Sequence, residues 1–180
     1  MPQRSTFRQQ SRRMALGGVM AALTVVILSL GGLVPLMTFA CPLLAMVCLI
    51  PVVCRYGAGT ALTVYAGAGF LSLFLCADKE LAFLYVFLGW YPAFRPRLER
   101  LSSNAVKAAV KCLLFSLAMA AMYLLLIYLF RMEAIAAEFA EYSVIAVVGL
   151  LVLGNVTFLL FDRAFGQLTK LYRWKFLKND

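Results

Sequence analysis

A stretch rich in arginine is followed directly by a long apolar run that contains no charged side chain. The run extends from Met14 to Val34, and about 20 apolar residues are enough for a helix to cross the hydrocarbon core of a bilayer. Arg4, Arg8, Arg12 and Arg13 precede it. Because basic residues that flank a span stay on the cytoplasmic side, this run predicts a membrane-spanning helix whose N-terminal end faces the cytoplasm.

The rest of the chain repeats this pattern. Hydrophobic residues make up 64% of the sequence and charged residues 14%, with a mean hydropathy of +0.90, which is outside the range of water-soluble domains. Five further candidate spans follow the first: 37–54, 57–76, 81–94, 108–130 and 143–161. The sequence therefore predicts an all-α integral membrane protein with six transmembrane helices. Its expected parts are a basic cytoplasmic N-terminus (1–13), a membrane domain (14–162) and a basic amphipathic cytoplasmic tail (163–180) lying at the membrane interface.

Charge sorting supports this topology, although two of the spans are irregular. With six spans and both termini cytoplasmic, 15 of the 17 Lys and Arg residues fall inside and five of the eight Asp and Glu residues outside, as the positive-inside rule demands. Pro42 and Pro51 interrupt the second span, which we expect to be kinked or broken. The fourth span, 81–94, would cover only about 21 Å as a helix, but the basic loop after it favours a crossing.

Several function classes lack the residues they need. The sequence contains no histidine and none of the motifs of zinc proteases, serine hydrolases or P-loop NTPases, so we expect no enzyme, no metal site and no cofactor. The five cysteines form no C-x-x-C pair and are interpreted as buried small hydrophobes. The net charge of +9 is carried by residues that flank apolar runs, which favours anionic lipid over nucleic acid as the partner of the basic residues.

The first span carries small residues at four-residue spacing. Gly17 with Ala21, and Gly18 with Ala22, form a strip on one helix face, where a second helix can approach closely. This strip is a candidate partner-docking surface.

The candidate ligand residues are aromatic or weakly polar. Tyr85 and Tyr123 offer a stacking face with a hydroxyl, and Asn155 lies within the sixth span. The alternatives are ordinary membrane tyrosines of the interfacial belt and an asparagine that bonds a neighbouring helix. Glu80 and Glu138 add acidic candidates in the outer loops, although Glu138 also fits a solvated loop face.

A family resemblance joins these features. The six spans, the basic N-terminus that leads into the small-residue strip, the Gly/Ala-rich span 57–76 and the stretch 88–94 with the basic residues after it resemble the substrate-binding (S) components of energy-coupling factor (ECF) transporters. The resemblance covers residues 12–161. It implies a multi-pass protein of the bacterial cell membrane that captures a vitamin-like micronutrient from outside. The implied partners are a transmembrane coupling protein and two cytoplasmic ATPases.

The resemblance also implies roles for particular residues. The family's small-residue strip on helix one contacts the coupling protein, and it would correspond to Gly17, Gly18, Ala21 and Ala22, with glycine in place of the first alanine. The ligand pocket would lie near the outer helix ends, with 35–38 and 78–80 as lids over Tyr85, Tyr123 and Asn155. The alternative is a non-transporting membrane scaffold of the cell-shape machinery type, which would have no ligand pocket.

Overall fold

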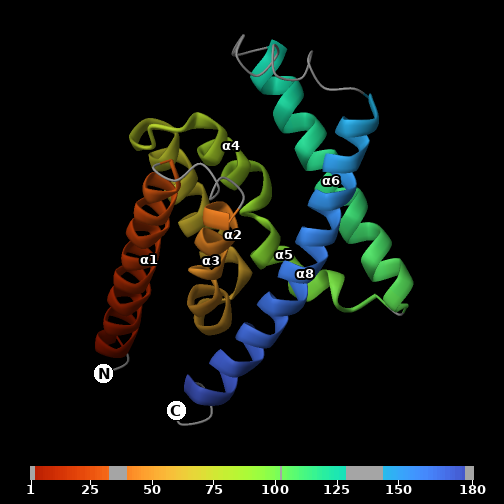
Figure 1. Cartoon of the computed structure of the whole chain (residues 1–180). Helices are drawn as coiled ribbons and strands as arrows, with labels where there is room; N and C mark the ends of the chain where they lie inside the picture. The colour runs from red at the N-terminus through yellow and green to blue at the C-terminus, as the bar shows by residue number, and fades with distance from the viewer. Residues whose placement is uncertain (1–2, 33–39, 102, 129–143, 177–180) are drawn as a thin grey trace. The chain divides into compact units, whose positions relative to one another are not determined.

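The computed structural model describes residues 3–32, 40–101, 103–128 and 144–176, and every regular element in these ranges is an α-helix. In chain order the helices are α1 (Gln3–Gly31), α2 (Ala40–Val47), α3 (Ile50–Leu75), α4 (Lys79–Leu88), α5 (Tyr91–Leu98), α6 (Asn104–Tyr128) and α8 (Val144–Phe176) (Figure 1). The chain divides into two compact units. Unit 1 comprises Met1–Arg97 and Leu168–Asp180, and unit 2 comprises Leu98–Gln167.

Four of the described helices are long and apolar enough to cross a membrane. They are Phe7–Gly31, Ile50–Leu75, Asn104–Tyr128 and Ile145–Phe176. Their outward faces are apolar: along α6, for example, Leu113, Leu117 and Leu124 are exposed, as expected for side chains that face lipid. The prediction of an all-helical membrane protein is thereby confirmed.

The second and fourth predicted spans are each divided into shorter helices. α2 has 8 residues and α4 has 10, or about 12 and 15 Å against a hydrocarbon core of about 30 Å. The expected break in the second span is confirmed. The chain leaves α2 after Val47, and Pro51 lies in the first turn of α3, where its missing N–H costs no hydrogen bond.

Two glycines fix further irregularities in unit 1. Gly57 has a φ of 81° and interrupts α3 with non-helical backbone, in a region of φ that other residues rarely adopt. Gly89 follows α4, where a Cβ would lie 2.6 Å from the Tyr85 carbonyl oxygen and 2.9 Å from the Tyr65 ring. Only glycine fits at this approach of α4 to α3.

The long helices extend beyond the apolar runs that predicted them. α1 begins at Gln3 and α8 continues to Phe176, so the proposed part boundaries at 13/14 and 162/163 lie within continuous helices. Charged side chains such as arginine and lysine are good helix formers, so a helix does not have to end where its sequence stops being apolar. The boundaries mark where the chain would leave the lipid, and they stay predictions.

Candidate functional site

Tyr85 is the most enclosed of the predicted ligand residues. It lies on α4 in unit 1 with 0% of its side chain exposed, and its ring centroid is 5.8 Å from that of Tyr65 on α3. Gly69 of α3 lies close to α4, since a Cβ there would lie 3.3 Å from a methyl group of Val86. The Tyr85 hydroxyl is buried and has no hydrogen-bond partner.

The polar groups around Tyr85 are satisfied by helix carbonyls. The Thr24 hydroxyl donates to the Met20 carbonyl at 2.8 Å, and the Tyr65 hydroxyl donates to the Val86 carbonyl. Thr24 lies beside the Tyr85 phenol, but no hydrogen bond of normal geometry joins the two hydroxyls. A buried hydroxyl without a partner costs free energy, so Tyr85 is an exception within its own surroundings.

Glu80 and its neighbours lie at the start of α4. Glu80 is half-buried, and five residues place it about 140° around the helix from Tyr85, so the two side chains leave α4 on different faces. The Asp78 carboxylate accepts from the Glu80 N–H at 3.0 Å and caps α4. Lys79 donates to the carbonyls of Leu73 and Cys76 at 2.8 and 2.9 Å, at the C-terminal end of α3. The predicted lid 78–80 is therefore tied to two helix ends.

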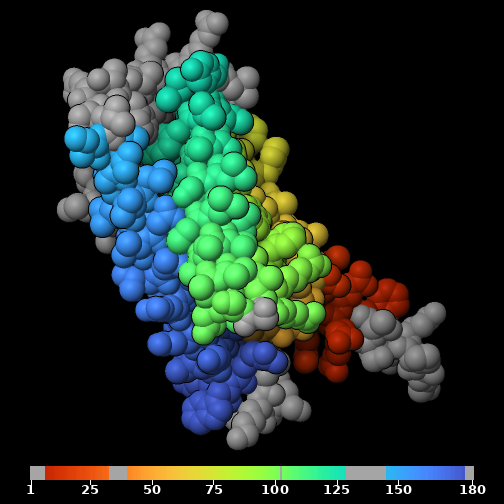
Figure 2. Space-filling model, turned by 90° about the vertical axis from the view of Figure 1, so that its right-hand side faces the viewer, coloured from red at the N-terminus to blue at the C-terminus, as the bar shows by residue number. Residues whose placement is uncertain are grey.

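Asn155 joins the two long helices of unit 2. α6 and the first part of α8 lie side by side (Figure 2), and the Phe115 and Phe158 rings stack between them at 4.9 Å. The Asn155 amide donates to the Ser116 hydroxyl at 3.0 Å and to the Leu151 carbonyl at 2.9 Å. This confirms the interpretation that Asn155 bonds a neighbouring helix. Its side-chain oxygen is nevertheless buried without a partner.

Tyr123 lies on the same face of α6 as Ser116, two helical turns or about 10.5 Å further along the axis. Its side chain is half-buried. Glu138 lies outside the described residues, as do residues 35–38, the other predicted lid.

Unit 2 also contains a buried ionic cluster, which the sequence analysis did not find. Lys111 on α6 donates to Asp162 on α8 at 2.5 Å and to Glu99 at 2.7 Å. Lys111 and Asp162 are 5% and 6% exposed. Lys107 approaches the other oxygen of Glu99 at 3.9 Å, so the two positive charges of the cluster are balanced by two negative charges.

The sequence did contain a signal for this cluster. Lys107 and Lys111 are four residues apart on one helix face, and Asp162 follows directly on an apolar run. All of these charges are predicted to lie on the cytoplasmic side, and the sequence pattern alone does not pair them. A charged side chain near the hydrocarbon region requires a partner of opposite charge. This requirement is the signal from which an ion pair could have been predicted.

The small-residue strip of α1 is divided between two faces. Gly17 is buried against α3, where a Cβ would lie 3.0 Å from a methyl group of Val64. Gly18 and Ala22 are exposed, Gly18 has open space beside it, and Ala21 is half-buried. Gly17 therefore serves packing within unit 1, and only Gly18 and Ala22 offer a free surface for close approach by another helix.

In the described part of the chain, no group of three His, Cys, Asp or Glu residues is arranged to hold a metal ion. None of the five cysteines, all of which the structure describes, forms a disulfide bond; Cys41, Cys48 and Cys76 are buried and the other two half-buried.

Comparisons of the chain with protein-family models, curated proteins and solved structures find no match. The function is therefore inferred from the residues of the chain itself.

Proposed function

We propose that the chain is the membrane-embedded substrate-capture subunit of an ATP-driven micronutrient uptake transporter, the role of S components in ECF transporters. It would cross the bacterial cell membrane six times with both termini in the cytoplasm. It would bind a vitamin-like molecule from outside and pass it on through a transmembrane coupling protein that two cytoplasmic ATPases drive.

The observation that carries this proposal is the pattern of unsatisfied polar atoms. Among the residues that the structure describes, two buried side-chain oxygens lack hydrogen-bond partners, the Tyr85 hydroxyl and the Asn155 Oδ1. Both belong to the ligand residues that the sequence proposed. Buried polar atoms in proteins are nearly always paired, and a bound molecule is one way to pair either of them within its own unit.

The two oxygens also indicate what a ligand would offer. Asn155 Oδ1 can only accept a hydrogen bond, and the Tyr85 hydroxyl can accept or donate. A small molecule that presents N–H or O–H groups could pair with either oxygen, and a flat heterocycle would in addition stack on the ring of Tyr85. Because Tyr85 is fully enclosed, such a ligand would need local displacement of α4 to reach it.

The docking surface in this proposal is the exposed line of Gly18 and Ala22 on α1. Small residues there allow the backbone of a coupling-protein helix to approach closely. A scaffold protein could use the same line, so this surface does not distinguish substrate capture from a scaffold function. Ligand binding distinguishes them, because a scaffold would have no ligand pocket.

Ligand-dependent thermal stabilisation tests the capture role. We would measure the melting temperature of the purified protein with each member of a panel of water-soluble vitamins, for the unsubstituted chain and for Tyr85→Phe. A tight ligand at 100 times its Kd stabilises by about 2.7 kcal/mol. The proposal expects one compound to raise the melting temperature of the unsubstituted protein and to raise that of Tyr85→Phe much less.

Tyr65→Phe is the matched control, because its hydroxyl is already satisfied by the Val86 carbonyl and should not contact ligand. A full response in Tyr85→Phe would remove this residue from the site. The absence of a response to every compound, together with an intact association with cell-shape proteins, would favour the scaffold alternative.

A further inference from the structure

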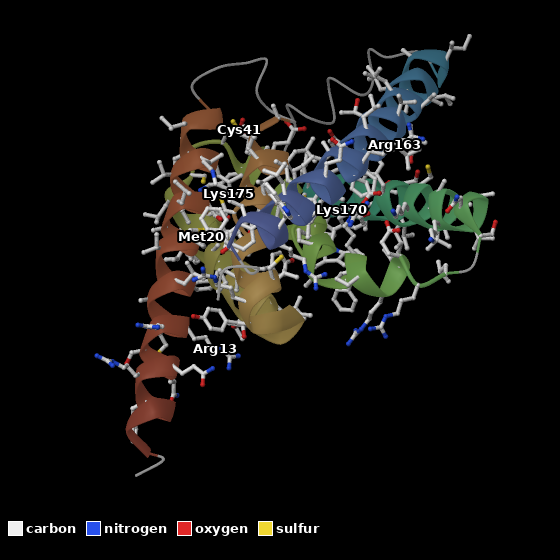
Figure 3. All side chains as sticks on the ribbon, turned by 90° about the horizontal axis from the view of Figure 1, so that it is seen from below. Arg13, Met20, Cys41, Arg163, Lys170 and Lys175 are labelled. Atoms are coloured by element: carbon white, nitrogen blue, oxygen red, sulfur yellow. The ribbon has the colours of Figure 1, made fainter. Side chains whose placement is uncertain are left out.

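The last part of α8, residues 168–176, combines positive charge with exposed apolar side chains. It contains Lys170, Arg173 and Lys175 and no acidic residue. Figure 3 shows Lys170 and Lys175 following one another along the helix, and all three basic side chains are exposed. This segment therefore presents a cationic surface.

Apolar side chains share the surface of the same segment. Leu168, Leu171, Trp174 and Phe176 are exposed. Around the helix, Leu168, Leu171 and Trp174 lie within an arc of about 120°, while Lys170 and Arg173 lie on the other side. Lys175, in the last turn, falls within the apolar arc, and Phe176 lies about 160° from Trp174. In water, the apolar side chains would stay exposed to solvent. In the hydrocarbon core, the charged side chains would lose their hydration. The headgroup layer avoids both costs, because it borders the acyl chains on one side and water on the other.

A second element contributes positive charge at the same place in unit 1. Arg173 is close enough to Cys54 on α3 to interact with it electrostatically, and the exposed Arg55 is the next residue along that helix. The acidic residues described in unit 1 are Asp78 and Glu80. They lie beyond the far end of α3, whose part 58–75 is about 27 Å long. Among the described residues, Arg55, Lys170 and Arg173 form no ion pair with an acid.

We propose that residues 168–176, together with Arg55, form a binding surface for the anionic phospholipid headgroups of the cytoplasmic leaflet. The basic side chains bind the headgroup phosphates, while Leu171 and Trp174 enter the upper acyl region. This proposal does not depend on ligand capture by the rest of the chain.

Fluorescence of Trp174 tests the proposal. The chain contains two tryptophans, and Trp90→Phe leaves Trp174 as the only one. We would reconstitute this variant in nanodiscs of phosphatidylcholine that contain about a quarter of acyl-brominated lipid, either phosphatidylglycerol or phosphatidylcholine. We expect quenching by the anionic brominated lipid to be stronger by about two-fold or more at low salt, and the preference to shrink at about 1 M salt, where the Debye length is about 3 Å.

Two triple variants in the same background provide the controls. The first variant combines Arg55→Gln, Lys170→Gln and Arg173→Gln, and both brominated lipids should quench it equally. The second variant combines Arg8→Gln, Arg12→Gln and Arg13→Gln. It removes the same charge from α1, and the anionic lipid should still quench it more strongly. If Trp90→Phe does not fold, the difference in quenching between the unsubstituted protein and Trp174→Phe gives the same signal.

Two results would overturn the proposal. Equal quenching by the two lipids in the unsubstituted background would mean that the surface does not select anionic headgroups. Absence of quenching by either lipid would place Trp174 in water or against another protein, and an acidic protein partner would then be the occupant.

Discussion

The ionic cluster of unit 2 and the surroundings of Tyr85 in unit 1 both bury polar groups, but only the ionic cluster pairs all of them. In unit 2 the charges of Lys111 and Asp162 are paired with each other, and Glu99 adds a second acceptor. In unit 1 the neutral hydroxyl of Tyr85 is enclosed and unpaired. Full pairing is what a structural role requires, whereas an unpaired buried group is a cost that a bound molecule can remove. The contrast separates residues that hold the protein together from residues available to a ligand.

The largest effect is expected from breaking the ionic cluster. Lys111→Met removes the ammonium group that donates to the buried Asp162 carboxylate, and we expect the free energy of unfolding to fall by about 3–5 kcal/mol. Denaturation of the purified protein in mixed micelles, followed by circular dichroism, measures this change.

The double variant Lys111→Met with Asp162→Leu is the control for this prediction. It removes both charges and should recover most of the loss. A double variant as unstable as Lys111→Met alone would show that packing around Lys111, and not an unpaired charge, causes the loss.

The next effect concerns the two glycines of α1. Gly17→Leu forces a side chain against Val64 and should cost about 1–3 kcal/mol of stability. Gly18→Leu points into open space, so the stability of the isolated protein should change little while the coupling protein no longer docks. Thermal unfolding and co-purification with that partner check the two outcomes. Equal destabilisation by both substitutions would contradict the division of the strip.

The two tyrosines of unit 1 should differ even without ligand. Tyr65→Phe leaves the Val86 carbonyl without its donor and should cost about 1 kcal/mol. Tyr85→Phe removes a hydroxyl that has no partner, so stability should stay unchanged or rise by up to about 1 kcal/mol. Parallel denaturation curves compare them. A loss at Tyr85 equal to that at Tyr65 would mean that the Tyr85 hydroxyl is already paired.

The smallest effect is expected at the neutral contact of unit 2. Ser116→Ala removes the hydroxyl that accepts from Asn155, and hydrogen bonds between membrane helices contribute about 0.6 kcal/mol on average. The change in unfolding free energy should be near this value, well below that of Lys111→Met. A loss of several kcal/mol would instead make Asn155 part of the structural framework.

Local features of the fold were predictable because they depend on neighbouring residues. The apolar runs predicted helices, Pro42 and Pro51 predicted the interruption between α2 and α3, and the length of 81–94 showed that this segment is short for a span. Helix ends were less predictable, since α1 and α8 continue through basic residues that favour helix as much as apolar ones do.

Contacts between distant residues were not predictable in the same way. Lys111 and Asp162 are 51 positions apart, and their pairing depends on how α6 and α8 are rotated against each other. The same holds for Gly17 and Gly18, which are adjacent in sequence although one packs on α3 and the other is exposed. Tyr85 and Asn155 could be proposed from residue type alone, but their unpaired oxygens depend on the packed neighbours.

The most direct test of the central claim is native mass spectrometry of the protein extracted gently from the membranes of its own host. The account predicts a bound compound of vitamin size on the unsubstituted chain, its loss in Tyr85→Phe, and co-purification of a membrane coupling protein with two ATPases. A chain that carries no bound compound and co-purifies with cell-wall or cell-shape proteins would contradict the transporter proposal. The unpaired oxygens would then be a feature of ordinary packing.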